Sequence, residues 1–231
     1  MIHSSDTICA LSTPSGSGAI GVIRLSGSKA VAIANSIFEG KNLEQQKGQT
    51  LHFGKITNGE EVIDEVLISL FKGPNSYTGE DTIEISCHGS SYILSKVLEL
   101  LLEKGANLAK PGEFTMRSFM NGKMDLAQAE AVGDLIAAES KAAHGLALNQ
   151  MRGGFSKKIA DLRHELIQFT ALIELELDFA EEDVEFANRS DLKDLVNNLV
   201  DMINGLLNSF ATGNVMKNGI PVAIVGQPNV G

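Results

Sequence analysis

The first 120 residues alternate short apolar segments with turn residues, a pattern that predicts a sheet. Asn58-Gly59 separates two of these segments, and because this pair adopts positive φ easily, the flanking strands should form an antiparallel hairpin. One helix is expected in this part, over residues 91–104, with Gly105 as its C-terminal cap. The expected strands are Ile8–Leu11, Ile20–Leu25, Leu51–Thr57, Val62–Phe71 and Thr82–Cys87.

Helical spacing replaces this pattern after about residue 120. Apolar side chains recur three or four residues apart over Ile159–Ile173 and Leu192–Phe210. The Ala-rich stretch Asp125–Asn149 predicts a further helix, which meets a break at Gly153-Gly154, and the acidic stretch 174–185 is interpreted as a solvated connection. Because so few long helices cannot close a core by themselves, we expect an incomplete helical bundle.

The final residues carry a candidate nucleotide site. The apolar segment Ile220–Val225 predicts a strand, and it runs into Gly226–Gly231, which matches six of the eight positions of the pattern G-x-x-x-x-G-K-[ST]. Glycines let backbone N–H groups close around phosphates, and the Lys and the hydroxyl that complete the pattern would follow Gly231. This glycine spacing is common in turns, but the strand before it favours a P-loop. We therefore expect the front part of a longer P-loop protein, and neither tight GTP binding nor hydrolysis by these 231 residues alone.

Composition narrows the classes of function. Hydrophobic residues make up 43% and charged residues 21% of the 231, which is typical of a soluble globular protein. The net charge of −10 argues against a surface that coats nucleic acid by charge, so any RNA contact should be local. The sequence has only two cysteines, Cys9 and Cys87, which lie far apart and outside any C-x-x-C spacing, so neither a structural zinc site nor a disulfide framework is indicated. With no apolar run long enough for a membrane span, the expected location is cytoplasmic.

Five ordered motifs give the chain a likeness to a known family. They span Asp6–Ala10, Gly21–Gly27, Gly73–Asp81, Pro111–Thr115 and Asn121–Ala131. With these motifs and the start of a P-loop, the chain resembles the tRNA modification GTPases of the MnmE (TrmE) family.

This resemblance implies an α+β protein in three parts. Residues 1–118 would form an N-terminal mixed α/β sheet domain that binds tetrahydrofolate and dimerises. Residues 119–217 would form the first part of a central helical domain, an incomplete α-helical bundle. Residues 218–231 would be the start of the G domain, with its first strand and a partial P-loop.

The resemblance also implies an activity for the longer protein. The family hydrolyses GTP and, with the FAD-dependent partner MnmG (GidA), adds an aminomethyl or carboxymethylaminomethyl group to carbon 5 of the wobble uridine of tRNA. The carbon comes from a one-carbon tetrahydrofolate, either 5-formyltetrahydrofolate or methylenetetrahydrofolate. The expected assembly is a homodimer that forms a hetero-oligomer with MnmG, acts on tRNA and involves no membrane.

The nucleotide site carries over from the family by position. The expected nucleotide contacts are Gly226, Asn229, Val230 and Gly231, and Asn229 is the expected ligand of a potassium ion. The longer protein would use GTP with Mg²⁺ and K⁺, whereas no catalytic residue is expected within these 231 residues.

The folate contacts of the family carry over to Arg24, Glu84 and Lys123. Arg24 shares a strand face with Ile20 and Val22, and a half-buried guanidinium there needs a carboxylate or a ligand. Glu84 could supply that carboxylate, so a salt bridge without a ligand is the alternative to a folate site. A pterin offers its donor-rich 2-amino edge to a carboxylate, and the glutamate tail of folate offers carboxylates to Arg or Lys.

Two further residues have plain alternatives. Lys123 precedes a helical stretch, and the alternative to a folate contact is a solvated surface lysine. His88 lies at a strand end and is interpreted as satisfying a local hydrogen bond, because no second His or Cys stands at metal-ligand spacing.

Three hypotheses remain for the chain as a whole. The first is a tRNA-modifying GTPase of which most of the G domain is missing here. The second is a folate-binding homodimerisation scaffold with no activity of its own. The third is an interaction protein that pairs two subunits through residues 1–120 and has a vestigial folate pocket.

Overall fold

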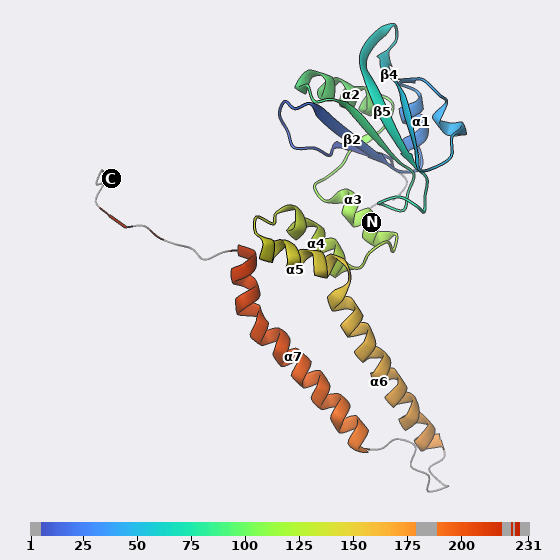
Figure 1. The fold of residues 1–231 in the computed structure, drawn as a ribbon. Helices are drawn as coiled ribbons and strands as arrows, with labels where there is room; N and C mark the ends of the chain where they lie inside the picture. The colour runs from blue at the N-terminus through green and yellow to red at the C-terminus, as the bar shows by residue number, and fades with distance from the viewer. Residues whose placement is uncertain (1–5, 179–188, 219–222, 224, 227–231) are drawn as a thin grey trace. The chain divides into compact units, whose positions relative to one another are not determined.

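A computed structural model describes residues 6–178, 189–218, 223, 225 and 226. The chain divides into two compact units, Met1–Asp125 and Leu126–Gly231 (Figure 1). The first unit is built around a sheet and the second consists of helices. The expected α+β fold is therefore confirmed.

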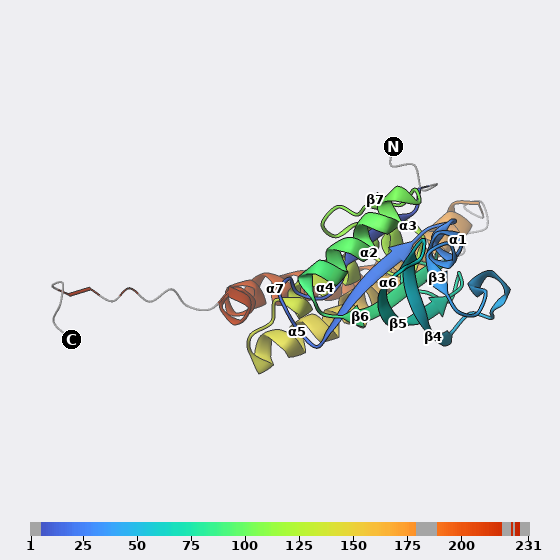
Figure 2. The ribbon, with the colours of Figure 1, turned by 90° about the horizontal axis from the view of Figure 1, so that it is seen from above.

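In the described part of the first unit, seven strands form one mixed sheet. Their order is β3-β4-β5-β6-β2-β1-β7, so β3 and β7 lie at opposite edges (Figure 2). β7 runs parallel to β1, and the other neighbours are antiparallel, including the expected hairpin of β4 and β5. The five expected strands are confirmed, and the two-residue strands β3 and β7 are additions. The bounds are β1 Ile8–Leu11, β2 Ile20–Ser26, β3 Phe38–Glu39, β4 Thr50–Asn58, β5 Glu61–Phe71, β6 Thr82–His88 and β7 Asn107–Leu108.

Three α-helices and a turn of 3₁₀-helix accompany the sheet in the described residues of this unit. They are α1 Ala30–Asn35, η1 Leu43–Gln45, α2 Ser91–Glu103 and α3 Glu113–Met120. The helix expected over residues 91–104 is confirmed as α2, but the expectation that it is the only helix of this part is wrong, because α1 and α3 are also present. α1 has six residues and α3 has eight, lengths over which helical periodicity is hard to distinguish from other apolar patterns.

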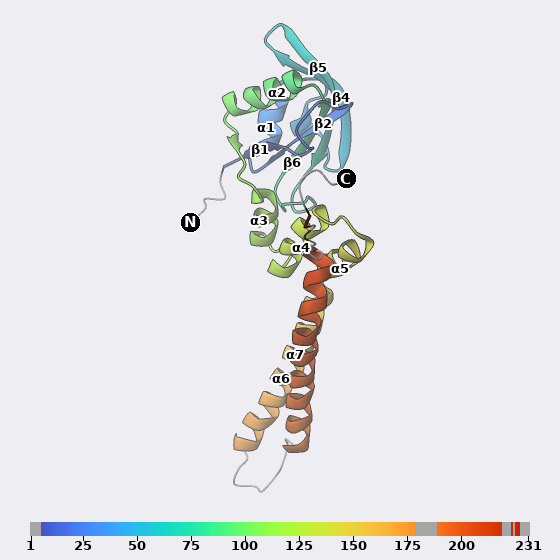
Figure 3. The ribbon, with the colours of Figure 1, turned by 90° about the vertical axis from the view of Figure 1, so that its left-hand side faces the viewer.

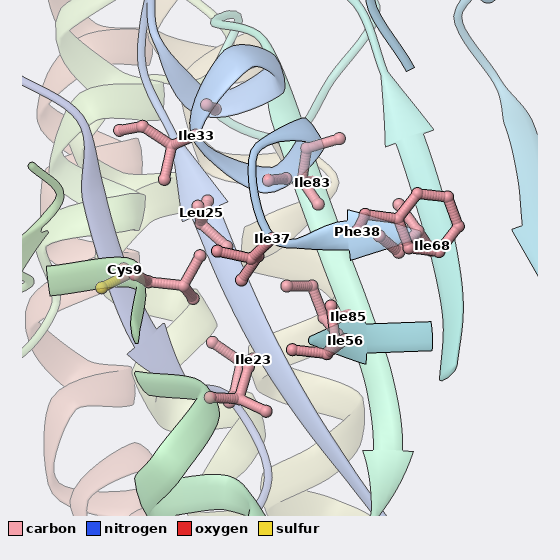
Figure 4. Close-up of a cluster of buried hydrophobic side chains, with 14 of the residues drawn as sticks. Cys9, Ile23, Leu25, Ile33, Ile37, Phe38, Ile56, Ile68, Ile83 and Ile85 are labelled. Atoms are coloured by element: carbon pink, nitrogen blue, oxygen red, sulfur yellow. The ribbon is translucent and has the colours of Figure 1, made fainter. Parts of the chain in front are cut away.

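The hydrophobic core lies between the sheet and the helices α1 and α2, which cover the same face of the sheet (Figure 3). Ile23, Ile68 and Ile85 come from three neighbouring strands and are fully buried in one cluster (Figure 4). Ala34 of α1 and Val97 of α2 belong to the same cluster. Successive residues of a strand point to opposite faces of the sheet, so the residues directly before and after each of these isoleucines point away from α1 and α2.

A glycine occupies a core-facing position of β2 because α2 approaches closely there. A Cβ atom on Gly21 would lie 2.5 Å from Cδ2 of Leu94. Any larger residue at this position would have to displace the Leu94 side chain or the helix that carries it.

The first unit extends to Asp125, beyond the expected domain boundary at residue 118, because α3 and the turn after it are bound to this unit. The hydroxyl of Ser118 donates to the carbonyl of Tyr77, and the Asn121 amide donates to the carbonyl of Thr78. Residue 118 therefore lies inside a helix that belongs to the sheet unit.

The described part of the second unit contains the helices α4 Leu126–Ile136, α5 Lys141–Met151, α6 Gly154–Asp178 and α7 Arg189–Asn218. The single helix expected over 125–149 is wrong. A new helix begins after Ser140, whose hydroxyl accepts a hydrogen bond from the Ala143 N–H at 3.1 Å and so caps α5. The expected break at Gly153-Gly154 is confirmed, since Gly153 has a φ of +77° between α5 and α6.

The two long helices α6 and α7 bury little of their apolar surface. Phe169 of α6 and Leu195 of α7 form a small buried cluster. Leu166, Ile173 and Val200 on the same two helices remain exposed. This matches the expected incomplete bundle.

The expected G-domain start lies mostly outside the described residues. Ala223, Val225 and Gly226 are described and have no regular secondary structure, whereas Asn229, Val230 and Gly231 lie outside. Among the described helices, none is long and apolar enough to cross a membrane. No cluster of three or more His, Cys, Asp or Glu side chains suited to a metal ion occurs in the described ranges.

Candidate functional site

Arg24 and Glu84 form an ion pair at the centre of the sheet face that points away from α1 and α2. They are direct cross-strand partners in the register of β2 with β6. Nε of Arg24 donates to Oε1 of Glu84 at 2.8 Å, and Nη2 of Arg24 lies 2.7 Å from the same carboxylate oxygen in the ion pair. Glu84 therefore supplies the carboxylate that Arg24 needs, as both the folate site and the salt-bridge alternative require.

This ion pair uses only part of each side chain. In the described structure, neither Nη1 of Arg24 nor Oε2 of Glu84 has a hydrogen-bond partner. The two side chains are 25% and 27% exposed, so the pair is partly removed from solvent yet reachable. The ion pair thus keeps one donor and one acceptor available, which a ligand with both acceptors and donors can use.

Two aromatic rings cover the guanidinium of Arg24. Its Cζ atom lies 5.2 Å from the ring centre of Tyr77 and 5.5 Å from that of Phe114. Both distances are within the range of cation–π attraction. The rings come from different parts of the chain, Tyr77 from the loop between β5 and β6 and Phe114 from α3.

The loop that carries Tyr77 is irregular and is held by side chains of α3. The Tyr77 hydroxyl lies 2.9 Å from Oγ1 of Thr115, within hydrogen-bond distance. The Ser118 hydroxyl donates to the Tyr77 carbonyl at 2.7 Å. These contacts fix the tyrosine at both its ring end and its backbone, so its place over Arg24 is set before any ligand arrives.

Lys123 follows α3 and contacts the loop that carries Tyr77, but it does not contact the ion pair. Its Nζ donates to the carbonyl of Pro74 at 2.9 Å, and its aliphatic stem lies beside Gly79. The side chain is exposed, so it has the freedom to turn toward a ligand carboxylate. The structure therefore brings Arg24 and Glu84 together and places Lys123 against the loop that carries Tyr77, apart from the ion pair.

Arg117 of α3 joins three parts of the first unit through its buried guanidinium. The side chain is 5% exposed and forms ion pairs at 3.1 to 3.3 Å with Asp6, Glu80 and Glu113. Burial acts to lower the pKa of Arg117, but the hydrogen bond to Glu113 and the surrounding carboxylates outweigh it, so the pKa is raised above its ordinary value. The arginine is thus permanently charged and ties the N-terminal segment, the loop and α3 together.

A hydroxyl network continues from this cluster into the sheet. The Ser26 hydroxyl of β2 donates to Oε2 of Glu80 at 2.7 Å. It also lies 2.6 Å from Oγ1 of Thr78, within hydrogen-bond distance. The loop is therefore anchored to the same strand that carries Arg24, two residues away from it.

Comparison with known proteins places the chain. Two family models match it, the N-terminus of the GTP-binding protein TrmE over residues 7–123 and the MnmE helical domain over residues 126–221. The tRNA modification GTPase MnmE of Flavobacterium psychrophilum is 62% identical over 98% of this chain. The proteins of the same name from Bacteroides thetaiotaomicron and Parabacteroides distasonis are 60% and 54% identical over 98% and 97% of it. The chain belongs to the MnmE family.

The chain spans about half the length of these MnmE relatives, between 49% and 50% of each. The family models meet between residues 123 and 126, where the structure changes from the sheet unit to the helical unit. The candidate site therefore lies wholly within the part that matches the MnmE (TrmE) N-terminus.

Sequence reasoning missed Tyr77, Phe114 and Arg117 as neighbours of the expected MnmE folate contacts. Tyr77 and Phe114 stand within the ordered motifs, but nothing in their spacing indicates that they meet at Arg24. One signal was available, since Tyr77 is one of only two tyrosines and lies in a loop rich in Gly and polar residues. A large ring in such a loop needs a partner to pack against.

His88 and the two cysteines take no part in this site. His88 makes the expected local hydrogen bonds, with its Nδ1 2.7 Å from Oδ1 of Asp64 and its N–H donating to Oδ2 at 2.8 Å. Burial raises the pKa of the Cys9 and Cys87 thiols to about 11, so both are protonated at neutral pH. Neither thiol is suited to act as a nucleophile.

The Arg117 cluster generates a stability prediction. Replacing Arg117 by Met keeps much of the side-chain volume but leaves the facing carboxylates without their cation. Removing one partner of a buried ion pair costs about 3–5 kcal/mol in the free energy of unfolding. We therefore expect urea unfolding of Arg117→Met to show a loss of that size.

The matched control is Lys96→Met, which breaks a surface pair with Glu99 on α2. Exposed pairs of this kind contribute roughly 0–1 kcal/mol, so this variant should stay close to the unsubstituted chain. Equal losses in the two variants would refute a stabilising role for the buried cluster.

Proposed function

We propose that the sheet unit binds a one-carbon tetrahydrofolate through Arg24, Glu84 and Lys123. The observation that supports this best is the unused capacity of the central ion pair, in which Nη1 of Arg24 and Oε2 of Glu84 have no partner in the described structure. A salt bridge whose only role was structural would gain from using both carboxylate oxygens and both forks of the guanidinium.

The chemistry of folate fits these groups. The free carboxylate oxygen of Glu84 accepts from the 2-amino edge of a pterin, and the remaining donor of Arg24 binds a ligand oxygen. Lys123 is exposed on a long stem and suits the carboxylates of the glutamate tail. 5-Formyltetrahydrofolate and methylenetetrahydrofolate are the forms proposed.

Substitutions at the ion pair test the folate proposal. Glu84→Gln keeps the shape of the side chain but removes its charge, and losing a charge-assisted hydrogen bond costs roughly 1.5–3 kcal/mol, or about ten- to a hundredfold in affinity. Arg24→Lys should also weaken binding, because an ammonium lacks the planar two-donor fork. Calorimetric titration with 5-formyltetrahydrofolate measures both losses.

Melting curves separate a ligand site from a structural salt bridge. With excess 5-formyltetrahydrofolate the unsubstituted chain should gain stability by mass action, and both variants should lose most of that gain. Without ligand, both variants should melt close to the melting temperature of the unsubstituted chain. Glu99→Gln, at an exposed glutamate of α2, serves as the control and should keep the full gain. If both variants melt lower without ligand and folate stabilises nothing, the pair is structural and the proposal fails.

For the full-length protein we propose GTP hydrolysis that serves tRNA modification, together with an FAD-dependent MnmG partner, in the cytoplasm. The proposed product is an aminomethyl or carboxymethylaminomethyl group on carbon 5 of the wobble uridine. Support comes from family membership, from relatives named tRNA modification GTPase, and from the glycine pattern at Gly226–Gly231. Mg²⁺ and a potassium ion held by Asn229 would complete the nucleotide site.

Potassium dependence tests this part of the proposal. Full-length protein should hydrolyse GTP faster in potassium than in sodium chloride, because Asn229 is proposed to contribute its side-chain oxygen to the larger ion. Asn229→Ala should remove most of that difference. Equal phosphate release in the two salts before substitution would contradict a potassium-assisted GTPase.

We also propose that two copies of the sheet unit pair. Support comes from apolar side chains on the sheet face that neither α1 nor α2 covers. Phe53 of β4 and Leu67 of β5 are cross-strand partners there and are 66% and 41% exposed, with Leu51 beside them. A second copy that covers this surface would remove these side chains from water.

Light scattering at micromolar concentration measures the proposed pairing. The expected mass is twice the 24.6 kDa of one chain. Phe53→Asp should shift the mass to that of a single chain by placing a charge in the contact. Tyr92→Asp, at an exposed aromatic of α2, should leave the mass unchanged. A single-chain mass without any substitution would rule out the homodimer and, with it, the scaffold alternative.

A further inference from the structure

We propose that Tyr77 and Phe114 are positioning residues for Arg24. Their rings lie 5.2 and 5.5 Å from its guanidinium carbon and form an aromatic clamp that sets the direction of the free Nη1 donor. This inference rests on the proposed folate function and adds two residues that act on the ligand through Arg24.

The clamp is built independently of any ligand. Tyr77 is held at its hydroxyl by Thr115 and at its carbonyl by Ser118, both on α3. Phe114 directly precedes Thr115 on α3. The contact between Tyr77 and Thr115 therefore binds the Tyr77 ring to the helix that carries Phe114. Both rings are half-buried and therefore have limited freedom to move away.

Glu84 alone cannot orient the guanidinium. Nε and Nη2 of Arg24 converge on a single oxygen of Glu84, and a plane attached through one acceptor can tilt about it. Rings that cover the guanidinium restrict this tilt, because leaving them forfeits cation–π attraction and exposes apolar surface. The donor that remains free is thereby held ready, which lowers the ordering cost when a ligand binds.

Arg117 also joins the two segments that carry the rings of the clamp. It lies one turn after Phe114 on α3 and forms an ion pair with Glu80, three residues after Tyr77. The helix and the loop that supply the two rings are therefore joined by a buried charge as well as by hydroxyl contacts.

Ring-removing substitutions test the clamp in the 231-residue chain. Phe114→Leu and Tyr77→Leu keep an apolar side chain but lose the π face, and we expect about three- to thirtyfold weaker binding of 5-formyltetrahydrofolate by calorimetry. Phe114→Tyr and Tyr77→Phe exchange one aromatic ring for another and should keep most of the affinity. Phe119→Leu makes the same change at an exposed position of α3 and should leave the affinity within about twofold.

A double-mutant cycle distinguishes positioning from direct contact or loss of structure. In an Arg24→Met background, Phe114→Leu should cause no further weakening, because the residue on which the ring acts is gone. The same fold-loss with and without Arg24 would overturn the positioning role, since the ring would then be acting on the ligand or on the fold.

A readout without ligand separates the failure of the clamp from the failure of the folate proposal. In an NMR spectrum, the Nε–Hε signal of Arg24 is assigned by its absence in Arg24→Met. Ring currents should displace its chemical shift, and in Phe114→Leu the shift should move toward the values usual for arginine. An undisplaced signal would overturn the clamp even if folate binds. A displaced signal in a chain that binds no 5-formyltetrahydrofolate would overturn the folate function, and with it the role of the clamp in binding.

Discussion

The pairing register of β2 with β6 is the constraint on which both faces of the sheet depend. It sets Ile23 opposite Ile85 on the core side and Arg24 opposite Glu84 on the other side. A shift by one residue would turn every side chain of a strand to the opposite face, burying a charge in the core and exposing an isoleucine. The buried apolar side and the charged site are therefore fixed by the same hydrogen bonds, and the stability of the core holds the ion pair in place.

A second level of organisation builds on that register through α3. The loop between β5 and β6 forms no strand of its own, and side chains of α3 and β2 hold much of it in place. A single buried guanidinium, Arg117, faces carboxylates from three segments, and the hydroxyl of Ser26 links the loop to the strand. Charge and hydroxyl contacts do here what sheet hydrogen bonds do elsewhere in the unit.

The sequence predicts the regular elements and the central ion pair, but not the surroundings of that pair. Strict alternation of apolar and polar residues predicted β6 and its polar face. The need of Arg24 for a carboxylate indicated Glu84 as a candidate partner before the register was known. α1 and α3 were not predicted because they are short. The break before α5 was not predicted because Ala-rich segments favour a helix on both sides of Ser140. The contacts of Tyr77 and Phe114 with Arg24 were not predicted, because these residues lie 53 and 90 positions after Arg24 and meet it only through tertiary packing. No local pattern encodes a contact of that kind.

The two rings beside Arg24 also constrain how this protein can change over evolutionary time. Each ring comes from a separate segment, and each contacts the same cation. An exchange at any one of Arg24, Tyr77 and Phe114 leaves the other two in surroundings suited to the lost partner. Drift at these three positions is therefore expected to be concerted, with a change at one tolerated chiefly in lineages where the other two have changed as well.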